Sequence, residues 1–292
     1  MKIMILGCNG MLGVALQNKL LNDYDVIGID KAIRKETKIK FYQLNLLEFE
    51  KLQNILLEER PDVIINVAAI VNLNLCEEDK KLAENLHCNL SKKIVETSLK
   101  INSKYIYIST DSIFDGKLGN YKEDDISNPL NNYALTKLKG EKATSNYNNS
   151  IIIRTNIYGY SKNQNSLLKW GYNSLNNDEE IKGYTNVIFN PVSVNQLAEA
   201  INILIKKDFK GILNIGSDKV ISKYEFLHII SEYLKKEELL KEAELNDISF
   251  VVRRPKNTSL NIQKMENILG KKYDIYFGIK EILEEIQNEN RK

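Results

Sequence analysis

The chain has 292 residues (33.6 kDa), enough to bury a sizeable core as one large α/β domain with an added lobe or as two modest domains. Its 41 Lys and Arg residues nearly balance 39 Asp and Glu residues, and the net charge of +2 gives no global excess for binding nucleic acid or an anionic membrane. The apolar run behind Met1 breaks at Gly7, too early for a signal segment or a membrane span, so we expect a soluble, cytoplasmic protein.

Cysteine and histidine are both scarce. The three cysteines, Cys8, Cys76 and Cys88, have no C-x-x-C spacing, so we expect buried thiols in a reducing compartment, with no disulfide and no metal site. The two histidines, His87 and His228, belong to no metal-binding or triad motif. We interpret both as ordinary helix residues.

Short apolar runs alternate with helix-like stretches through the first half of the chain. We expect strands at Ile3 to Leu6, Asp25 to Ile29, Asp62 to Asn66, Lys104 to Ser109 and Ile151 to Arg154, and helices at Met11 to Leu21, Glu48 to Glu59, Glu77 to Lys100 and Leu130 to Tyr147. The strand-like runs are apolar almost throughout, which is typical of strands covered by helices on both faces. This order predicts a Rossmann-type, doubly wound parallel sheet.

The second half has a looser pattern. An Asn-rich polar stretch runs from Ser161 to Asn177, and a strand at Ile212 to Ile215 and a helix beginning near Ser222 follow. We therefore expect residues 1–160 to form a dinucleotide-binding domain, with return segments near 186–215. Residues 161–292 should form mainly a smaller, mixed lobe that closes over a substrate.

A glycine-rich segment, Gly7 to Gly13, lies between the first strand and the first helix with the spacing G-x-x-G-x-x-G. Backbone N–H groups and a helix N-terminus can approach a pyrophosphate there, although a glycine turn without a ligand is the alternative. Asp30 disfavours that alternative, because it ends the second strand about 20 residues later, where a carboxylate accepts hydrogen bonds from ribose hydroxyls. The pattern predicts NAD(P)H, and Asp30 modestly favours NADH because a carboxylate repels a 2′-phosphate, which Lys31 or Arg34 could accept.

Tyr133 and Lys137 lie four residues apart on a predicted helix and so share one face. The same Y-x-x-x-K spacing begins at Tyr158 and Tyr276, but only Tyr133 follows a strand that ends in a hydroxyl, Thr110. Reduction of a ketone by hydride leaves an alkoxide that must take a proton, which Tyr133 would give while Lys137 lowers its pKa and Thr110 holds the carbonyl oxygen. The alternative is structural, with a packed tyrosine and a solvated lysine.

As a set, these motifs resemble the extended short-chain dehydrogenase/reductase superfamily, and particularly the dTDP-4-dehydrorhamnose reductase family. The resemblance covers nearly the whole chain, and its landmarks are Gly7 to Gly13, Arg60 to Asn66 with Ala68 and Ala69, Ser109 to Asp111, Phe114 to Gly116, Asn128 to Leu130, Tyr133, and Arg253 to Pro255. It implies that the cofactor is held by Gly7, Gly10, Met11, Leu12, Gly13, Asp30, Asn45, Leu46, Ala68, Ala69, Ile70, Tyr133 and Lys137. It also implies catalysis by Thr110, Tyr133 and Lys137, and substrate binding by Thr110, Asp111, Ser112 and Asn156.

Three positions bear on the details of this resemblance. Asn89 matches an asparagine that supports the active-site strand in the superfamily. Ser112 stands where the reductases usually carry a tyrosine, and the run around Asn156 and Ile157 lacks their usual tryptophan and looks closer to sugar-nucleotide epimerases. The resemblance therefore leaves the identity of the sugar open.

The leading hypothesis is an NAD(P)H-dependent reductase of a nucleotide-linked 4-keto sugar. One alternative is an epimerase or dehydratase that recycles tightly held NAD. Another is a dinucleotide-binding regulatory protein that resembles the β subunit of methionine adenosyltransferase. The expected partner is a small-molecule nucleotide sugar, with no nucleic acid and no membrane, and a homodimer is compatible with the resemblance.

Overall fold

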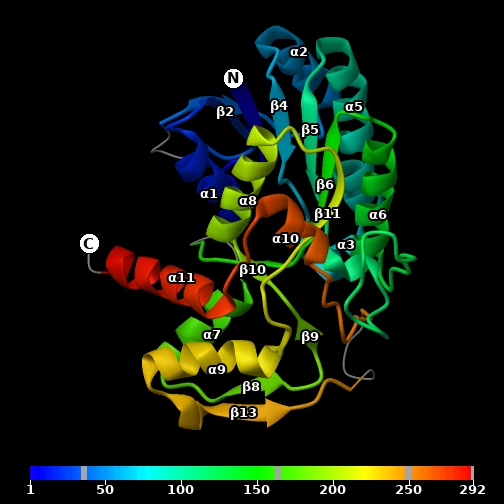
Figure 1. Cartoon of the computed structure of the whole chain (residues 1–292). Helices are drawn as coiled ribbons and strands as arrows, with labels where there is room; N and C mark the ends of the chain where they lie inside the picture. The colour runs from blue at the N-terminus through cyan, green and yellow to red at the C-terminus, as the bar shows by residue number, and fades with distance from the viewer. Residues whose placement is uncertain (34–37, 162–165, 247–251, 291–292) are drawn as a thin grey trace.

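The computed structural model describes residues 1–33, 38–161, 166–246 and 252–290. Its centre is a seven-stranded parallel sheet in the order β11-β6-β5-β4-β1-β2-β3 (Figure 1). The strands are β1 Lys2–Leu6, β2 Asp25–Asp30, β3 Lys40–Gln43, β4 Val63–Asn66, β5 Lys104–Ile108, β6 Ser150–Thr155 and β11 Gly211–Ile215. The predicted Rossmann-type sheet is confirmed, although the sequence analysis did not anticipate the edge strand β3.

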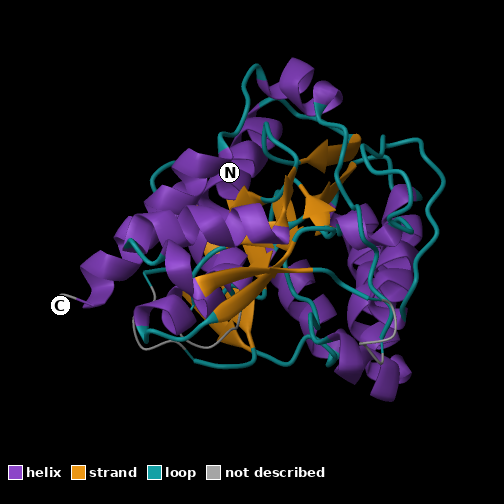
Figure 2. Ribbon diagram, turned by 90° about the horizontal axis from the view of Figure 1, so that it is seen from below, coloured by secondary structure: helices purple, strands orange, loops and turns teal. Residues whose placement is uncertain are grey.

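Both faces of the sheet are buried. In β1, Ile3 and Ile5 belong to one hydrophobic cluster, whereas Met4 and Leu6 belong to another on the opposite face. The first cluster includes side chains of α1 (Met11–Leu20) and α8 (Val194–Lys206), and the second includes α2 (Phe49–Glu59) and α5 (Leu90–Ile101). Figure 2 shows the strands enclosed between helices, which explains why the central strand sequences are apolar almost throughout.

A smaller lobe lies below the carboxyl end of the sheet in Figure 1. It contains α7 Leu167–Asn176, β8 Ile181–Tyr184, β9 Ile188–Phe189, β12 Ile221–Ser222, α9 Lys223–Leu234 and β13 Leu240–Ala243. β13 pairs in parallel with β8, β12 pairs antiparallel with β9, and α7 packs on α9. Of the remaining elements, β7 Ile157–Tyr158 pairs with β10 Val192–Ser193, α10 Gln263–Leu269 packs on β11, and α11 Ile275–Asn290 packs on β10 and α9.

One expectation about a helix is wrong, and another helix was not anticipated. The single helix expected from Glu77 to Lys100 is divided into α3 Leu73–Glu78, α4 Lys80–Glu84, a π-helix at Asn85–Asn89 and α5. Asp79 causes the first break, because its backbone is not helical (φ −120, ψ 76) and its side chain caps α4 by accepting the Leu82 N–H at 2.8 Å. The polar stretch after Ser161 contains α7, which begins where Ser166 accepts the Lys169 N–H at 3.1 Å.

The cysteines and the helices give no sign of metal binding or membrane insertion in the part of the chain that the structure describes. Cys8, Cys76 and Cys88 are buried free thiols. Among the described residues, no three His, Cys, Asp or Glu side chains gather into a metal-binding group. No described helix combines the length and the apolar character that crossing a membrane requires.

A buried ion pair joins α6 (Asn132–Ser145) to β6. Arg154 donates from Nε and Nη2 to the carboxylate of Glu141 at 2.9 to 3.2 Å, and its Nη1 donates to the Glu123 carbonyl at 2.9 Å. The two side chains are only 6% and 3% exposed. Since α6 carries Tyr133 and Lys137, this pair holds the helix in place against the sheet.

We expect Glu141→Ala to lower the free energy of unfolding by about 3–5 kcal/mol, because it leaves the Arg154 charge buried without a partner. Urea denaturation measures the loss. The double variant Glu141→Leu/Arg154→Met, which buries no charge, should recover most of it. A loss below about 1 kcal/mol in the single variant would mean that water reaches Arg154.

Candidate active site

The loops after β1 and β4 meet at the point where the strand order reverses, which is where open α/β sheets bind ligands. Gly7 has φ +84, and a Cβ atom there would lie 3.0 Å from the Ala68 backbone nitrogen. A Cβ atom on Gly13 would lie 2.5 Å from the Gly7 carbonyl oxygen. Both positions therefore require glycine for packing, whatever binds in the crevice between the loops.

Helix α1 presents its N-terminus to this crevice. Its N-cap is Gly10, which has no side chain to cap the helix, and its first turn carries no acidic residue. Leu12 is buried in the core below, and Met11 is partly buried. An uncapped helix N-terminus of this kind suits the phosphates of a dinucleotide, through backbone N–H groups and the helix dipole.

Asp30 stands at the end of β2 beside the same loop. Its Oδ2 accepts the Asn9 N–H at 3.0 Å, and its Oδ1 accepts the Ala32 N–H at 3.4 Å. The carboxylate thus links the glycine loop to β2 and lies where ribose hydroxyls would approach. Lys31 is exposed, and Arg34 lies outside the described residues.

The other residues assigned to the cofactor lie along the rim of the sheet. Leu46 is buried, while Asn45 is exposed and its Oδ1 accepts the Leu47 N–H at 3.1 Å. Ala69 is exposed, and the Ile70 N–H donates to His87 Nε2 at 3.0 Å. The structure brings the loops after β1, β2 and β4 to one edge, and Asn45 follows β3 at the end of that edge.

Two asparagines fix the start of α6 and hence the position of Tyr133. Asn131 is the N-cap and accepts the Ala134 N–H at 2.9 Å. The next residue, Asn132, donates its N–H to Glu77 Oε1 at 2.7 Å, which anchors the helix to α3. One turn later, Lys137 is buried and donates from Nζ to the last carbonyl of β5, that of Ile108, at 2.5 Å.

The pKa values correct one expectation about this pair. The sequence analysis expected Lys137 to lower the pKa of Tyr133, but burial raises the pKa of Tyr133 to about 12, against a smaller lowering by its hydrogen bond with Thr110. Burial also lowers the pKa of Lys137 to about 7, partly offset by the Glu141 charge. Tyr133 is therefore protonated at neutral pH, which is the form that donates a proton.

His87 is a site residue that the sequence analysis missed. It lies in the π-helix, is fully buried, and packs edge-to-face on Tyr133 with 5.7 Å between ring centres. Its Nδ1 is 2.8 Å from Thr136 Oγ1, and burial together with the Lys137 charge holds its pKa at about 2. Asn89, expected to support the active-site strand, instead donates to Asn85 Oδ1 at 2.9 Å within its own helical segment.

Asp111 forms the centre of the site beyond β5. It is 1% exposed and accepts four side-chain hydrogen bonds. Its Oδ1 accepts from the hydroxyls of Thr110 and Ser112 at 3.1 and 3.2 Å. Its Oδ2 accepts from Asn156 Nδ2 at 2.9 Å and from Thr258 Oγ1 at 2.6 Å. All four residues assigned to the substrate are thus brought together, with Asp111 beneath the others.

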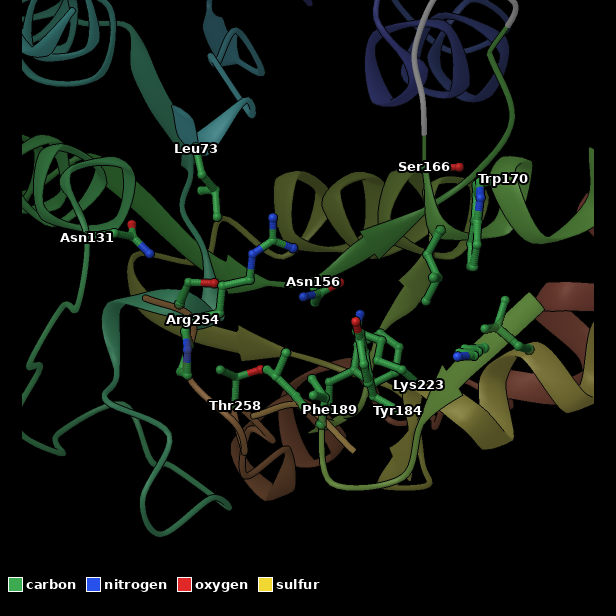
Figure 3. A pocket seen from close by; sticks show the side chains of 17 residues that line it. Leu73, Asn131, Asn156, Ser166, Trp170, Tyr184, Phe189, Lys223, Arg254 and Thr258 are labelled. Atoms are coloured by element: carbon green, nitrogen blue, oxygen red, sulfur yellow. The ribbon is translucent and has the colours of Figure 1, made fainter. Parts of the chain in front are cut away.

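A pocket of about 620 Å³ opens between this cluster and the smaller lobe. Figure 3 shows labelled side chains from several elements converging on it. It is lined by Leu73, Ser112, Asn131, Asn156, Ser166, Leu167, Trp170, Lys182, Tyr184, Val187, Phe189, Lys223, Leu227, Leu245, Arg254, Pro255 and Thr258. A second hollow of about 880 Å³ shares Leu245 and Arg254 with it and adds Arg253, Lys117 and Lys256. The size and the mixed lining suit a ligand of cofactor or nucleotide-sugar dimensions.

Most lining residues of the smaller lobe were not predicted. Trp170, the single tryptophan of the chain, lines the pocket from α7. The reductases usually carry a tryptophan directly after β6, a position where this chain has none. Lys223 and Tyr184 likewise belong to no motif. The presence of one tryptophan in an otherwise polar stretch was the only available signal.

Residues 1–288 match the family described as the RmlD substrate binding domain. The chain belongs to this family. That membership confirms the resemblance to dTDP-4-dehydrorhamnose reductases inferred from the motifs.

Relatives of this family member carry names of different kinds. Methionine adenosyltransferase 2 subunit beta of Bos taurus is 28% identical over 299 residues, covering 97% of this chain and 87% of that protein. A hypothetical dTDP-4-dehydrorhamnose reductase of Sulfolobus tokodaii is 31% identical with a TM-score of 0.84, covering 94% and 97% of the two chains. The dTDP-4-dehydrorhamnose reductase of Bacillus anthracis, solved in complex with NADP, is 26% identical with a TM-score of 0.87, covering 97% and 99%.

We expect Gly10→Val to weaken NAD(P)H binding without unfolding the protein. Gly10 has φ −71 and ψ 170, which any residue can adopt, so the backbone tolerates a side chain at this N-cap position, where phosphates would approach the helix. Calorimetry measures the affinity. Gly13→Val is the contrasting variant, because its side chain would collide with the Gly7 carbonyl and should lower stability as well. Unchanged affinity in Gly10→Val would show that the loop holds no dinucleotide.

We expect wild-type protein to bind NADH at least as well as NADPH, because a 2′-phosphate would meet the Asp30 carboxylate. Asp30→Ala should shift the preference towards NADPH. Parallel titrations with the two cofactors measure this ratio. A wild-type preference for NADPH of tenfold or more, about 1.4 kcal/mol, would mean that a neighbouring cation dominates.

Proposed function

We propose that this protein is an NAD(P)H-dependent reductase of a nucleotide-linked 4-keto sugar. The observation that carries the proposal is the partly buried phenol of Tyr133, which is hydrogen-bonded to Thr110 at the carboxyl end of β5 and whose pKa is raised by desolvation. This arrangement lies beside a pocket whose lining includes Ser112 and Asn156. Membership in a family with dTDP-4-dehydrorhamnose reductases supports the same substrate class.

The crevice has the features that a nicotinamide dinucleotide requires. Close backbone approach at Gly7 and Ala68, the uncapped N-terminus of α1 and the Asp30 carboxylate would hold the phosphates and a ribose. When bound, this cofactor supplies the hydride. By resemblance to the family, the Lys137 ammonium would also hold the nicotinamide ribose hydroxyls.

Residues of the chain would then supply the proton that the substrate oxygen needs. Addition of hydride to a ketone leaves negative charge on oxygen, and Tyr133 donates its phenolic proton to that oxygen. With substrate bound, Thr110 would donate its hydroxyl proton to the same oxygen in place of Asp111 and align it with the phenol. Since burial raises the pKa of Tyr133 to about 12, the donor form is present throughout the neutral range.

The two hollows together would accommodate the two ends of a nucleotide sugar. The sugar end would lie against Ser112, Asn156 and Thr258, which are held by Asp111. Arg254 lines both hollows and would contribute positive charge for the phosphates between sugar and base.

A regulatory, non-catalytic function is the second candidate. It is favoured by the 28% identity to a methionine adenosyltransferase β subunit over 97% of this chain. A regulator would bind the dinucleotide without turnover and would copurify with an enzyme. The presence of buried Thr110 and Lys137 beside the partly buried Tyr133 argues for turnover.

Purified protein mixed with dTDP-4-dehydro-6-deoxy-L-mannose and NADH or NADPH should oxidise the cofactor in proportion to product. Isomerisation without net oxidation of cofactor would indicate an epimerase. Failure of a panel of 4-keto sugar nucleotides with both cofactors would favour the regulatory candidate.

We expect Tyr133→Phe to reduce turnover by about 10²-fold or more, the scale of general acid catalysis, with cofactor affinity nearly intact. Lys137→Met should reduce both turnover and cofactor affinity. Steady-state kinetics and cofactor titration measure the two effects. Wild-type rates in Tyr133→Phe on the true substrate would eliminate the phenol as proton donor.

A further inference from the structure

Lys223 occupies an unfavourable electrostatic position that proton transfer to the sugar does not explain. It is the first residue of α9, where a cation meets the positive end of the helix dipole. The acid closest to it along the helix, Glu225, is occupied in a capping box, accepting the Ser222 N–H at 2.6 Å. Burial lowers the pKa of Lys223 to about 8, so the fold itself destabilises this charge.

The Lys223 ammonium has no carboxylate partner among the described residues. Its Nζ lies 3.4 Å from the ring centre of Phe189, and it forms no ion pair with any described Asp or Glu. The negative charge of Asp111 raises the pKa of Lys223. However, both oxygens of the Asp111 carboxylate already accept hydrogen bonds from neighbouring side chains. Arg254 adds a like charge that lowers the pKa further.

The ammonium faces the pocket at the end where the sugar would react. Ser112, Asn156 and Thr258 line that end and all bond to Asp111, the carboxylate whose field reaches Lys223. In Figure 3, Lys223 lies beside Phe189 and Tyr184 in the same wall. The described lining residues include Lys182, Lys223 and Arg254 and no Asp or Glu, so this lining suits an anionic group of a ligand.

We propose that Lys223 is a specificity-determining residue that binds an oxyanion of the substrate close to the reacting sugar carbon. This inference rests on the proposed function. Two groups of a nucleotide sugar have the required chemistry, namely the phosphate bonded to the sugar and a carboxylate on the sugar ring. Either would accept charge-assisted hydrogen bonds from the ammonium in a partly dehydrated pocket, where such bonds are strong.

Calorimetric titration of the cofactor-bound protein with dTDP, dTMP, UDP-glucuronate and UDP-glucose tests the inference. If Lys223 binds the sugar-linked phosphate, Lys223→Met weakens dTDP at least about tenfold and leaves dTMP unchanged, since only dTDP carries that phosphate. If it binds a ring carboxylate, the variant loses the wild-type preference for UDP-glucuronate over UDP-glucose. Lys223→Arg, which keeps the charge, should retain most of the affinity in both cases.

Lys182→Met is the matched control, because Lys182 lines the same pocket but is exposed. It should change these affinities little. Lys223→Met should unfold at the same temperature as wild type or higher, since it removes a partly buried cation from a helix N-terminus. A clear loss of thermal stability would overturn the inference in favour of a structural function.

Two failures are distinguishable. If wild type binds the nucleotides and Lys223→Met binds each of the four ligands with the same affinity as wild type, the inference about Lys223 is wrong and the proposed function stands. If wild type binds none of them, the nucleotide-sugar function fails, and the inference about Lys223 fails with it.

Discussion

The catalytic end of this fold depends on the hydrogen bonding of one buried carboxylate. A carboxylate that is 1% exposed is stable only if the protein replaces its water, and Asp111 receives four donors from three distant parts of the chain. Thr110 and Ser112 flank it after β5, Asn156 follows β6, and Thr258 comes from the C-terminal segment. Satisfying this carboxylate therefore draws the C-terminal segment onto the end of the sheet and fixes the Thr110 hydroxyl next to Tyr133.

Burial of the proton-handling groups sets their chemistry. The same desolvation raises the pKa of Tyr133 and lowers that of Lys137, which favours a neutral phenol and weakens the ammonium. His87 stays neutral in this environment and contacts Tyr133, while its ring nitrogens join the loop after β4 to α6. The chain thus links the cofactor crevice to the proton donor through one buried imidazole.

The two ligand regions are built in different ways. Backbone groups and small residues such as Gly7 and Ala68 form the dinucleotide crevice, so its recognition is general within the fold. Side chains of the smaller lobe, including Trp170 and Lys223, form the other region. This division explains how relatives of similar fold carry names of different function, because function resides in the site and not in the fold.

The sequence by itself determined the features that depend on local periodicity and spacing. These are the parallel sheet, the glycine turn before α1, the carboxylate ending β2, and the placement of Tyr133 and Lys137 one helical turn apart. Tertiary structure alone decided the rest, because the contacts involved join residues far apart in the chain. The break at Asp79 separates α3 from the rest of the expected helix, and the partner Thr258 lies 147 residues from Asp111. The pKa of Tyr133 moves opposite to the expected direction because burial outweighs the hydrogen bond from Thr110. Lys223 belongs to no motif, and only the folded pocket shows that its ammonium forms no ion pair with an Asp or Glu in the part of the chain that the structure describes.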